Sequence, residues 1–189
     1  HEVSLSAFAL DIFEVTNAQY AACAAAGVCA PPVVIASLTR GDYYTNEEFA
    51  NFPMINVEWE EAQTYCRWAG KRLPTEAEWE LAARGSTPKA YSWGDEVPDC
   101  LKANVFDNPS MSSCVSDTTA VGSYPEGASE FGVMDMTGNV WEWVADSYLE
   151  DFYSNSPVEN PQADTNNQLR TVRGGGWNSN WLAVRVSSR

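Results

Sequence analysis

The chain has 189 residues, of which 44% are hydrophobic and 20% charged, a composition typical of one globular domain. Its formal net charge of −15 at pH 7, with only 11 Lys and Arg residues, argues against nucleic acid as a partner, because phosphate binding requires clustered basic side chains. The sequence contains no apolar run of the roughly 18 residues that a membrane-spanning helix requires. The excess of acidic residues has two interpretations, solubility and cation binding.

The first elements in chain order are a strand and a helix. Residues 2–8 alternate apolar and polar side chains, with Val3, Leu5 and Ala7 on one side, which predicts a half-buried strand. Thr16, followed three residues later by Gln19, is typical of a helix capping box. A helix is therefore expected after Thr16, ending at Gly27.

Two further helices are indicated by their ends. The stretch "NVEWEEAQTYCRWAG" predicts a helix that begins at Asn56, carries glutamates near its positive end and stops at Gly70. In "TEAEWELAARG", Thr75 is the expected N-cap, with Glu78 in the capping-box position and Gly85 as the stop. Three helices are thus expected in the first half of the chain.

The second half reads as short strands and long loops. Residues 140–146 and 169–177 are the strand candidates, and the glycines from Gly174 to Gly176 should interrupt or end the second one. Residues 86–135 and 147–169 carry most of the Pro, Asn, Ser and Asp, so these segments are expected to be irregular. Loops this long need disulfides, buried rings or a metal to hold them.

The spacing of the five cysteines predicts two disulfides and one thiol. Cys23 and Cys29 flank a helix end, and Cys100 and Cys114 bracket a polar stretch, so we expect these two pairs to be bridged. Cys66 falls on the apolar face of the second helix and is expected to be a buried free thiol. Zinc is the competing interpretation, but the chain has no CxxC pair and only one histidine. Two disulfides imply an oxidising, extracytoplasmic location.

The motifs, taken in order, resemble one known family. "FEVTNAQY", "GKRLPTEAEWE", "GNVWEW" and "RGGGW" are similar to successive segments of the formylglycine-generating enzymes, also called sulfatase-modifying factors. The resemblance implies a C-type-lectin-like α+β fold with few short strands, about three helices and long ordered loops. It also implies that residues 1–189 form a single domain of this type.

The first and the last strand of the family's domain have no match in this sequence. A glycine-rich strand usually precedes the segment that matches residues 1–8, and a closing strand usually follows the segment that matches residues 184–189. We therefore expect one or both terminal strands to be missing from this chain or supplied by a partner.

The family's calcium ligands map onto the stretch "DMTGNVWEW". The resemblance assigns Asp135, the carbonyl oxygens of Gly138 and Val140, and Glu142 to one calcium site. Ca²⁺ prefers six to eight oxygen ligands drawn from carboxylates and carbonyls, so this set is chemically suitable. The residues alone also allow Glu142 to be a buried, hydrogen-bonded carboxylate without a metal.

A second calcium site of the family begins at Asn104 and the carbonyl oxygen of Val105. Its other ligands would fall within residues 113–117, which do not align cleanly with the family pattern. Asp117 is available there, although it could equally cap a turn.

The family's catalytic residues are missing from the sequence. Formylglycine-generating enzymes hold copper with two cysteines between the "RGG" motif and a downstream arginine, but the matching residues 173–185 contain no cysteine. Cu(I) requires soft thiolate ligands, so copper oxidase chemistry is not expected. A related branch holds iron with three histidines, which a chain with one histidine cannot do.

A non-catalytic binding or structural module is the expectation that follows. Its partner, a protein or a carbohydrate, would contact the segment that replaces the active site, here Asn178, Ser179, Asn180 and Trp181. Trp177 is expected in the core instead. Two alternatives stay open: an enzyme of the same family with an unrecognised site, and a hypervariable ligand-binding protein of a diversity-generating retroelement.

Overall fold

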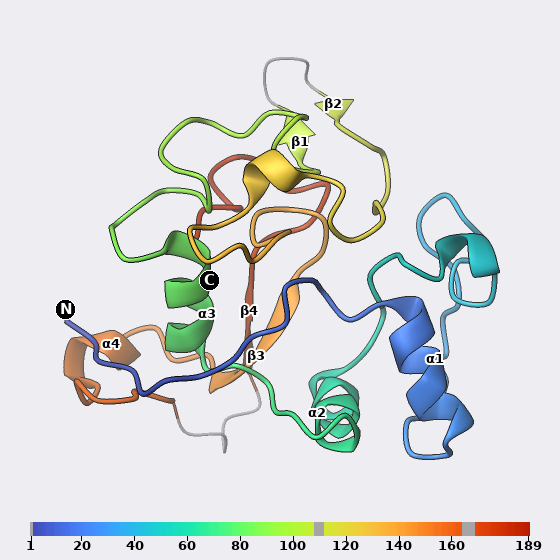
Figure 1. The fold of residues 1–189 in the computed structure, drawn as a ribbon, viewed down its shortest axis with the longest axis horizontal. Helices are drawn as coiled ribbons and strands as arrows, with labels where there is room; N and C mark the ends of the chain where they lie inside the picture. Colours follow the sequence, from blue (N-terminus) through green and yellow to red (C-terminus); the bar gives the residue numbers. More distant parts are fainter. Residues whose placement is uncertain (1, 108–111, 164–168) are drawn as a thin grey trace.

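The computed structural model describes residues 2–107, 112–163 and 169–189. Helix α3 lies against the paired strands β3 and β4 in the middle of the molecule, as Figure 1 shows. Helices α1 and α2 pack together on one side, while the short strands β1 and β2 lie at another end (Figure 1). Loops form most of the remaining chain, so the expected α+β class with few strands is confirmed.

Two helices start where their caps predict. Helix α1, Asn17–Ala25, begins after Thr16, whose hydroxyl accepts a hydrogen bond from the Gln19 N–H at 3.3 Å. Gln19 returns the interaction by accepting from the Thr16 N–H at 2.9 Å. Helix α3, Glu76–Arg84, has the same arrangement with Thr75 and Glu78. These capping boxes satisfy backbone donors that the first turn leaves unpaired.

Helix α2, Trp59–Trp68, begins later than expected. Asn56 was the predicted first residue, but its backbone has a φ of 59°, which is incompatible with a helical start. Its side-chain amide instead donates to the carbonyl of Ala36 at 3.1 Å. Glu58 is the actual cap, and its N–H donates to the Glu61 carboxylate at 2.8 Å.

Strand β3, Glu142–Ser147, pairs antiparallel with β4, Arg170–Arg173. This pairing confirms the two strand candidates of the second half, and Gly174 with a φ of 88° ends β4 as expected. The predicted strand at residues 2–8 is wrong. Within residues 2–8, Ser4 alone is bridged, to Glu159, and this isolated bridge does not extend into a ladder.

Several short elements were not predicted. Strands β1, Phe106–Asp107, and β2, Ser112–Ser113, form an antiparallel pair, and α4, Phe152–Asn155, is a single helical turn. Two 3₁₀ turns, Glu47–Phe49 and Pro125–Gly127, also occur. Elements of two to four residues are too short to show a hydrophobic period, so the sequence could not reveal them.

Both expected disulfides are present. Cys23 is bonded to Cys29 and Cys100 to Cys114, each pair with a Cα–Cα distance of 5.3 Å. Cys66 is the free cysteine, but it is half-buried instead of fully buried as expected, and burial raises the pKa of its thiol. The first disulfide packs with Tyr20 and Tyr65 between α1 and α2.

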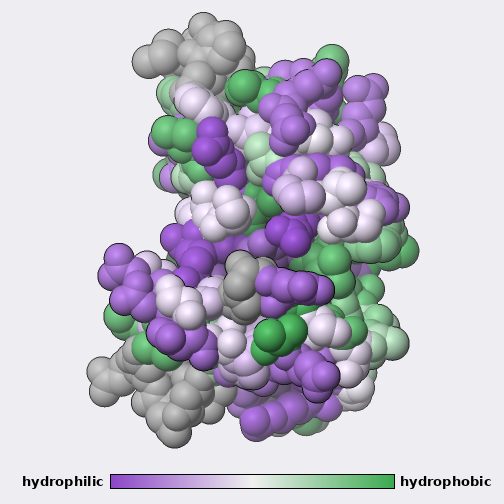
Figure 2. Space-filling view, turned by 90° about the vertical axis from the view of Figure 1, so that its left-hand side faces the viewer, coloured by the Kyte–Doolittle hydropathy of each residue, from purple (hydrophilic) through white to green (hydrophobic). Residues whose placement is uncertain are grey.

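The main core joins α3 to β3. Trp79 from α3 is fully buried and packs with Met136, Val144 and Val186. On the surface, hydrophilic residues separate smaller hydrophobic groups across the face shown in Figure 2. In the described part of the chain, no helix has the length and apolar character needed to cross a membrane.

Candidate functional site

The loop at residues 135–142 curls tightly because three of its residues adopt left-handed backbone conformations. Asp135, Gly138 and Asn139 have φ values of 60°, 90° and 58°. Asp and Asn tolerate this region better than most other residues. At Gly138 only glycine fits, since a β-carbon there would clash with the carbonyl oxygen of Asn104.

Asn139 holds this loop in place from inside the protein. Its side chain is buried, and its amide donates to a carboxylate oxygen of Glu14 at 2.9 Å. Its side-chain oxygen accepts from the Thr119 N–H at 2.9 Å and from the Asn104 amide at 3.3 Å. Sequence reasoning assigned no role to Asn139 or Glu14, although both lie inside the motifs that carried the resemblance.

Three acidic side chains surround the loop. Asp135 accepts a hydrogen bond from the Gly122 N–H at 2.6 Å, and Glu142 accepts one from the Trp79 indole at 3.0 Å. Glu14 accepts the Asn139 bond through one oxygen only. The Oε1 atoms of Glu14 and Glu142 are buried and have no hydrogen-bond partner among the described residues.

The surroundings of these three carboxyl groups disfavour their ionised forms. Burial, reinforced by the charge of Asp135, raises the pKa of Glu142 to about 7. Burial also raises the pKa of Glu14, to which the charges of Asp135 and Glu142 add, and that of Asp135. In the part of the chain that the structure describes, no Lys or Arg forms an ion pair with any of the three. Such groups must either hold protons or bind a cation.

The predicted ligands of the first calcium site offer suitable oxygens. The carbonyl oxygens of Gly138 and Val140 accept no hydrogen bond from the described residues, and Glu142 contributes its unpartnered Oε1. Across residues 2–107, 112–163 and 169–189, no three acidic, His or Cys side chains converge closely enough to form a metal site from side chains alone. A cation at this loop would therefore depend on backbone carbonyls as well as carboxylates, as Ca²⁺ sites commonly do.

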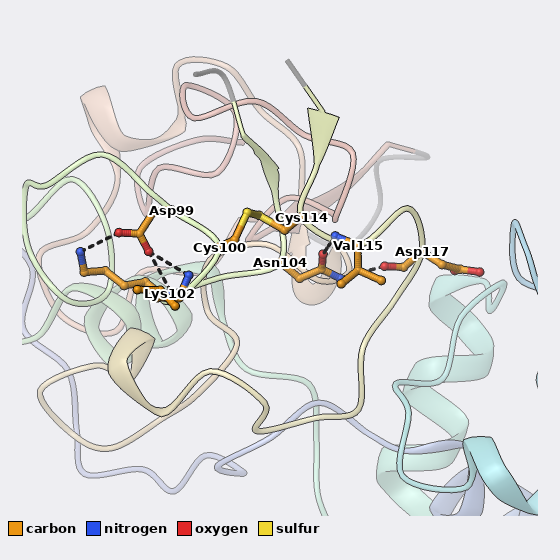
Figure 3. Close-up of a disulfide and its surroundings, with 8 residues drawn as sticks. Asp99, Cys100, Lys102, Asn104, Cys114, Val115 and Asp117 are labelled. Carbon is orange, nitrogen blue, oxygen red and sulfur yellow. Dashed lines mark hydrogen bonds and ion pairs between the residues drawn. A yellow bond between two sulfur atoms is a disulfide. The ribbon is translucent and has the colours of Figure 1, made fainter. Parts of the chain in front are cut away.

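The predicted second site has a different environment. The Asn104 amide donates to the carbonyl of Asp117 at 2.9 Å and accepts from the Val115 N–H at 3.3 Å, beside the Cys100–Cys114 disulfide (Figure 3). The Asp117 carboxylate accepts from Ser37 at 2.6 Å and lies 3.2 Å from the Arg40 guanidinium. Because Asp117 already has a cationic partner, its charge is balanced without a metal, and the site at Asn104 and Val105 stays a prediction.

The predicted partner-binding residues form a turn after β4. Ser179 accepts a hydrogen bond from the Gly176 N–H at 3.0 Å, and the Asn180 side chain accepts from Leu182 N–H at 2.9 Å. These two side chains shape the turn, and Asn178 and Asn180 are both exposed. Trp181 is half-buried, with the Arg185 guanidinium 5.3 Å from its ring centroid. Trp177 is also half-buried, less than the core position expected for it.

Few short strands, long ordered loops and a central helix packed on one strand pair define a C-type-lectin-like α+β domain. The chain belongs to the formylglycine-generating enzyme family, since residues 1–189 match the sulfatase-modifying factor enzyme 1-like domain.

Individual relatives agree with this assignment. Over 95% of its length, the chain is 38% identical to a protein named serine/threonine-protein kinase pkn1 from Chlamydia caviae. The matched region makes up 29% of that protein. Over 67% of its length, the chain is 39% identical to the formylglycine-generating enzyme of Streptomyces coelicolor. The matched region makes up 42% of that enzyme. The chain thus spans less than half of these curated relatives. In fold it is similar to Treponema denticola variable protein 1, with a TM-score of 0.76 at 23% identity over 99% of this chain and 79% of that one.

Proposed function

We propose that this chain is a non-catalytic binding module of the formylglycine-generating enzyme family. One calcium ion would be held by Asp135, the carbonyls of Gly138 and Val140, and Glu142. A protein or carbohydrate partner would contact the turn at residues 176–182. The observation that carries the calcium part is the buried, unpartnered Oε1 of Glu142 beside Asp135, with no basic side chain of the described residues pairing with either.

Charge balance supports calcium at this loop. Leaving two or three buried carboxylates ionised without a cation is costly, and protonating them at neutral pH costs free energy as well. A divalent ion removes both costs, while the unpaired carbonyl oxygens of Gly138 and Val140 supply neutral ligands. Bound calcium would supply a fixed positive charge that cross-links the loop.

The absence of cysteine from residues 173–185 supports a non-catalytic role. The relatives named formylglycine-generating enzyme make an oxidase of the same family the alternative. An assay with copper and a cysteine-containing sulfatase-type peptide separates the two proposals. We expect no aldehyde product, and product formation above that of a heat-denatured control would refute the non-catalytic proposal.

The two disulfides support a location outside the cytoplasm, since thiols are kept reduced inside it. Labelling of the native cell with a thiol reagent that does not cross membranes, before and after reduction, tests this. If the reagent labels none of the five cysteines in intact cells even after reduction, the proposed location is contradicted.

A hypervariable ligand-binding protein is the second candidate function. The fold similarity to a Treponema denticola variable protein and the exposure of Asn178 and Asn180 favour it. Sequencing the gene from many isolates tests it, because substitutions should concentrate at the exposed positions of residues 178–182. An even distribution of substitutions along the chain would reject this candidate.

The experiment that tests the calcium proposal is thermal unfolding after chelation and after calcium is restored. A ligand that binds only the folded state at a hundred times its Kd stabilises it by about 2.7 kcal/mol. For a chain of this size that corresponds to a rise in Tm of roughly 5–10 °C. An unchanged Tm at saturating calcium would refute the calcium site.

A further inference from the structure

Trp141 lies at the junction between the candidate calcium loop and the candidate partner-binding turn. It stands between the proposed ligands Val140 and Glu142, yet its side chain is 41% exposed. A β-carbon built on Gly176 would lie 3.5 Å from Trp141 Cδ1 and 3.4 Å from the side-chain oxygen of Asn178. The Trp141 ring and the Asn178 side-chain oxygen therefore both lie next to Gly176, an arrangement that the sequence did not predict.

Backbone hydrogen bonds connect the same two segments. The Gly138 N–H donates to the carbonyl of Gly174 at 2.9 Å, and the Trp177 N–H donates to the carbonyl of Asn139 at 2.8 Å. Directly beside these bonds, Glu142 is the register partner of Arg173 at the end of the β3–β4 ladder. These bonds are the contacts through which a change in the order of residues 138–142 would reach the turn that begins at Gly174.

The six residues of the proposed surface carry no formal charge, and the nearest cation given for them is the Arg185 guanidinium, 5.3 Å from the centroid of the Trp181 ring. Trp141, Gly176, Asn178, Ser179, Trp181 and Leu182 are all uncharged, on a chain whose net charge is −15. A neutral partner fits such a patch, whereas an anionic one would be repelled by the molecule as a whole. An exposed indole ring can stack on the apolar face of a sugar ring, while an adjacent amide can exchange hydrogen bonds with hydroxyl groups.

The size of the surface also distinguishes between partner classes. A specific protein interface covers about 800 Å² on each partner, with a core of several apolar side chains. Here one turn and one tryptophan contribute the uncharged patch, which suits one or two sugar rings better than a protein face.

Resting on the proposed function, we propose that Trp141 and the turn at residues 176–182 form a binding surface for a neutral carbohydrate, and that calcium at residues 135–142 orders it. Calcium acts here through the two backbone hydrogen bonds and not by contacting the sugar. Trp141 lies in the calcium loop and also forms part of the proposed sugar-binding surface.

The coupling is tested by residue-resolved amide hydrogen exchange of the intact chain, with calcium and with excess chelator. We expect calcium to slow exchange at Gly138 and Trp177, whose N–H groups make the two connecting bonds. The Ala26 N–H, which donates within the end of α1 at 3.1 Å, serves as the internal reference and should not change. Calcium binding without slower exchange at Trp177 would overturn the coupling while leaving the calcium site intact.

The ligand class is tested by calorimetry with a panel of neutral oligosaccharides: maltohexaose, cellohexaose, chitohexaose and mannohexaose. We expect at least one to bind in calcium, and its affinity to fall at least about tenfold with chelator and with Trp141→Ala. Trp68→Ala is the matched control, because Trp68 is 39% exposed but lies on α2, and this variant should bind normally.

The outcomes separate this inference from the proposed function. No heat of calcium binding and no change in Tm would refute the calcium site and the coupling together. Calcium binding with no neutral sugar bound, or sugar binding that is equal in chelator, would overturn this inference alone. Binding of an acidic oligosaccharide such as hexagalacturonate, without any neutral one, would also overturn it.

Discussion

The side-chain amide of Asn139 donates a hydrogen bond to a carboxylate oxygen of Glu14 at 2.9 Å, across 125 residues of sequence. This bond joins the segment that leads into α1 to the loop that leads into β3. Through the Asn139 carbonyl, which accepts from the Trp177 N–H, the same residue also reaches the turn after β4. Three distant parts of the chain therefore meet at one buried residue.

Asn139→Ala should destabilise the protein by about 2–4 kcal/mol, because it removes the side-chain hydrogen bonds that Asn139 makes with Glu14, Thr119 and Asn104. Urea unfolding measures this cost. Asn51→Ala, at an exposed position, is the matched control and should stay within about 0.5 kcal/mol of the parent. Equal stability of the two variants would show that the buried network contributes nothing.

Glu142→Gln should abolish the rise in Tm that calcium produces, because an amide oxygen cannot replace the carboxylate charge. In chelator at pH 8 the same variant should unfold at a higher temperature than the parent, since it removes a buried, unpaired charge. Glu60→Gln, on the exposed face of α2, should behave like the parent in both conditions. A normal calcium response from Glu142→Gln would exclude Glu142 as a ligand.

The stability of the calcium-free protein should depend on pH in a defined direction. The pKa of Glu142 is about 7 in the folded state against 4.5 for an unperturbed carboxyl. The folded state thus binds more protons within this window, so stability is fully present below pH 4.5 and declines as pH rises to about 7. The expected loss is about 3 kcal/mol, at about 1.4 kcal/mol per pKa unit. Urea unfolding in chelator between pH 4 and 8 measures the slope. The Glu142→Gln variant should lose the part of the slope that Glu142 contributes, while the raised pKa values of Glu14 and Asp135 keep the rest.

Arg173→Met should cost about 3–5 kcal/mol, because it breaks a buried ion pair: the buried Glu76 keeps only Arg189, and two backbone carbonyls lose their donor. The Arg173 side chain is fully buried, 3.4 Å from the Glu76 carboxylate and 2.7 Å from that of Glu80, and it donates to the carbonyls of Val186 and Ser188. Arg84→Met removes a more exposed arginine that also pairs with Glu80, and it should cost less than about 1 kcal/mol. Similar unfolding free energies for the two variants would contradict the buried network.

Replacing both Cys100 and Cys114 by Ser should lower the free energy of unfolding by about 3 kcal/mol, since this disulfide closes a loop with a sequence separation of 14. The Cys23–Cys29 pair, with a separation of 6, should contribute less. Cys66→Ala is the control without a disulfide. Urea unfolding of the three variants ranks them, and a larger loss for the shorter loop would contradict the chain-entropy argument.

Several features of this protein follow from the sequence because their interactions are local. The capping boxes of α1 and α3 join residues three positions apart, and the two disulfides join cysteines within one loop each. The order of the motifs was enough to predict the family, the fold class and the candidate ligands Asp135 and Glu142. The strand pair β3–β4 was visible as two apolar segments, although its register was not.

Only the tertiary structure decided which of the candidate residues have partners. Asp117 forms an ion pair with Arg40 and accepts a hydrogen bond from Ser37, about 80 residues earlier, whereas Glu14 and Glu142 each keep a buried oxygen unpaired. The alternating pattern of residues 2–8 is a local signal, but a strand also needs a neighbour, and this segment has a single isolated bridge, from Ser4 to Glu159. A sequence pattern reports what a segment prefers by itself. Charge compensation and strand pairing depend on which distant residues the folded chain brings within a few ångströms, and that information exists only in three dimensions.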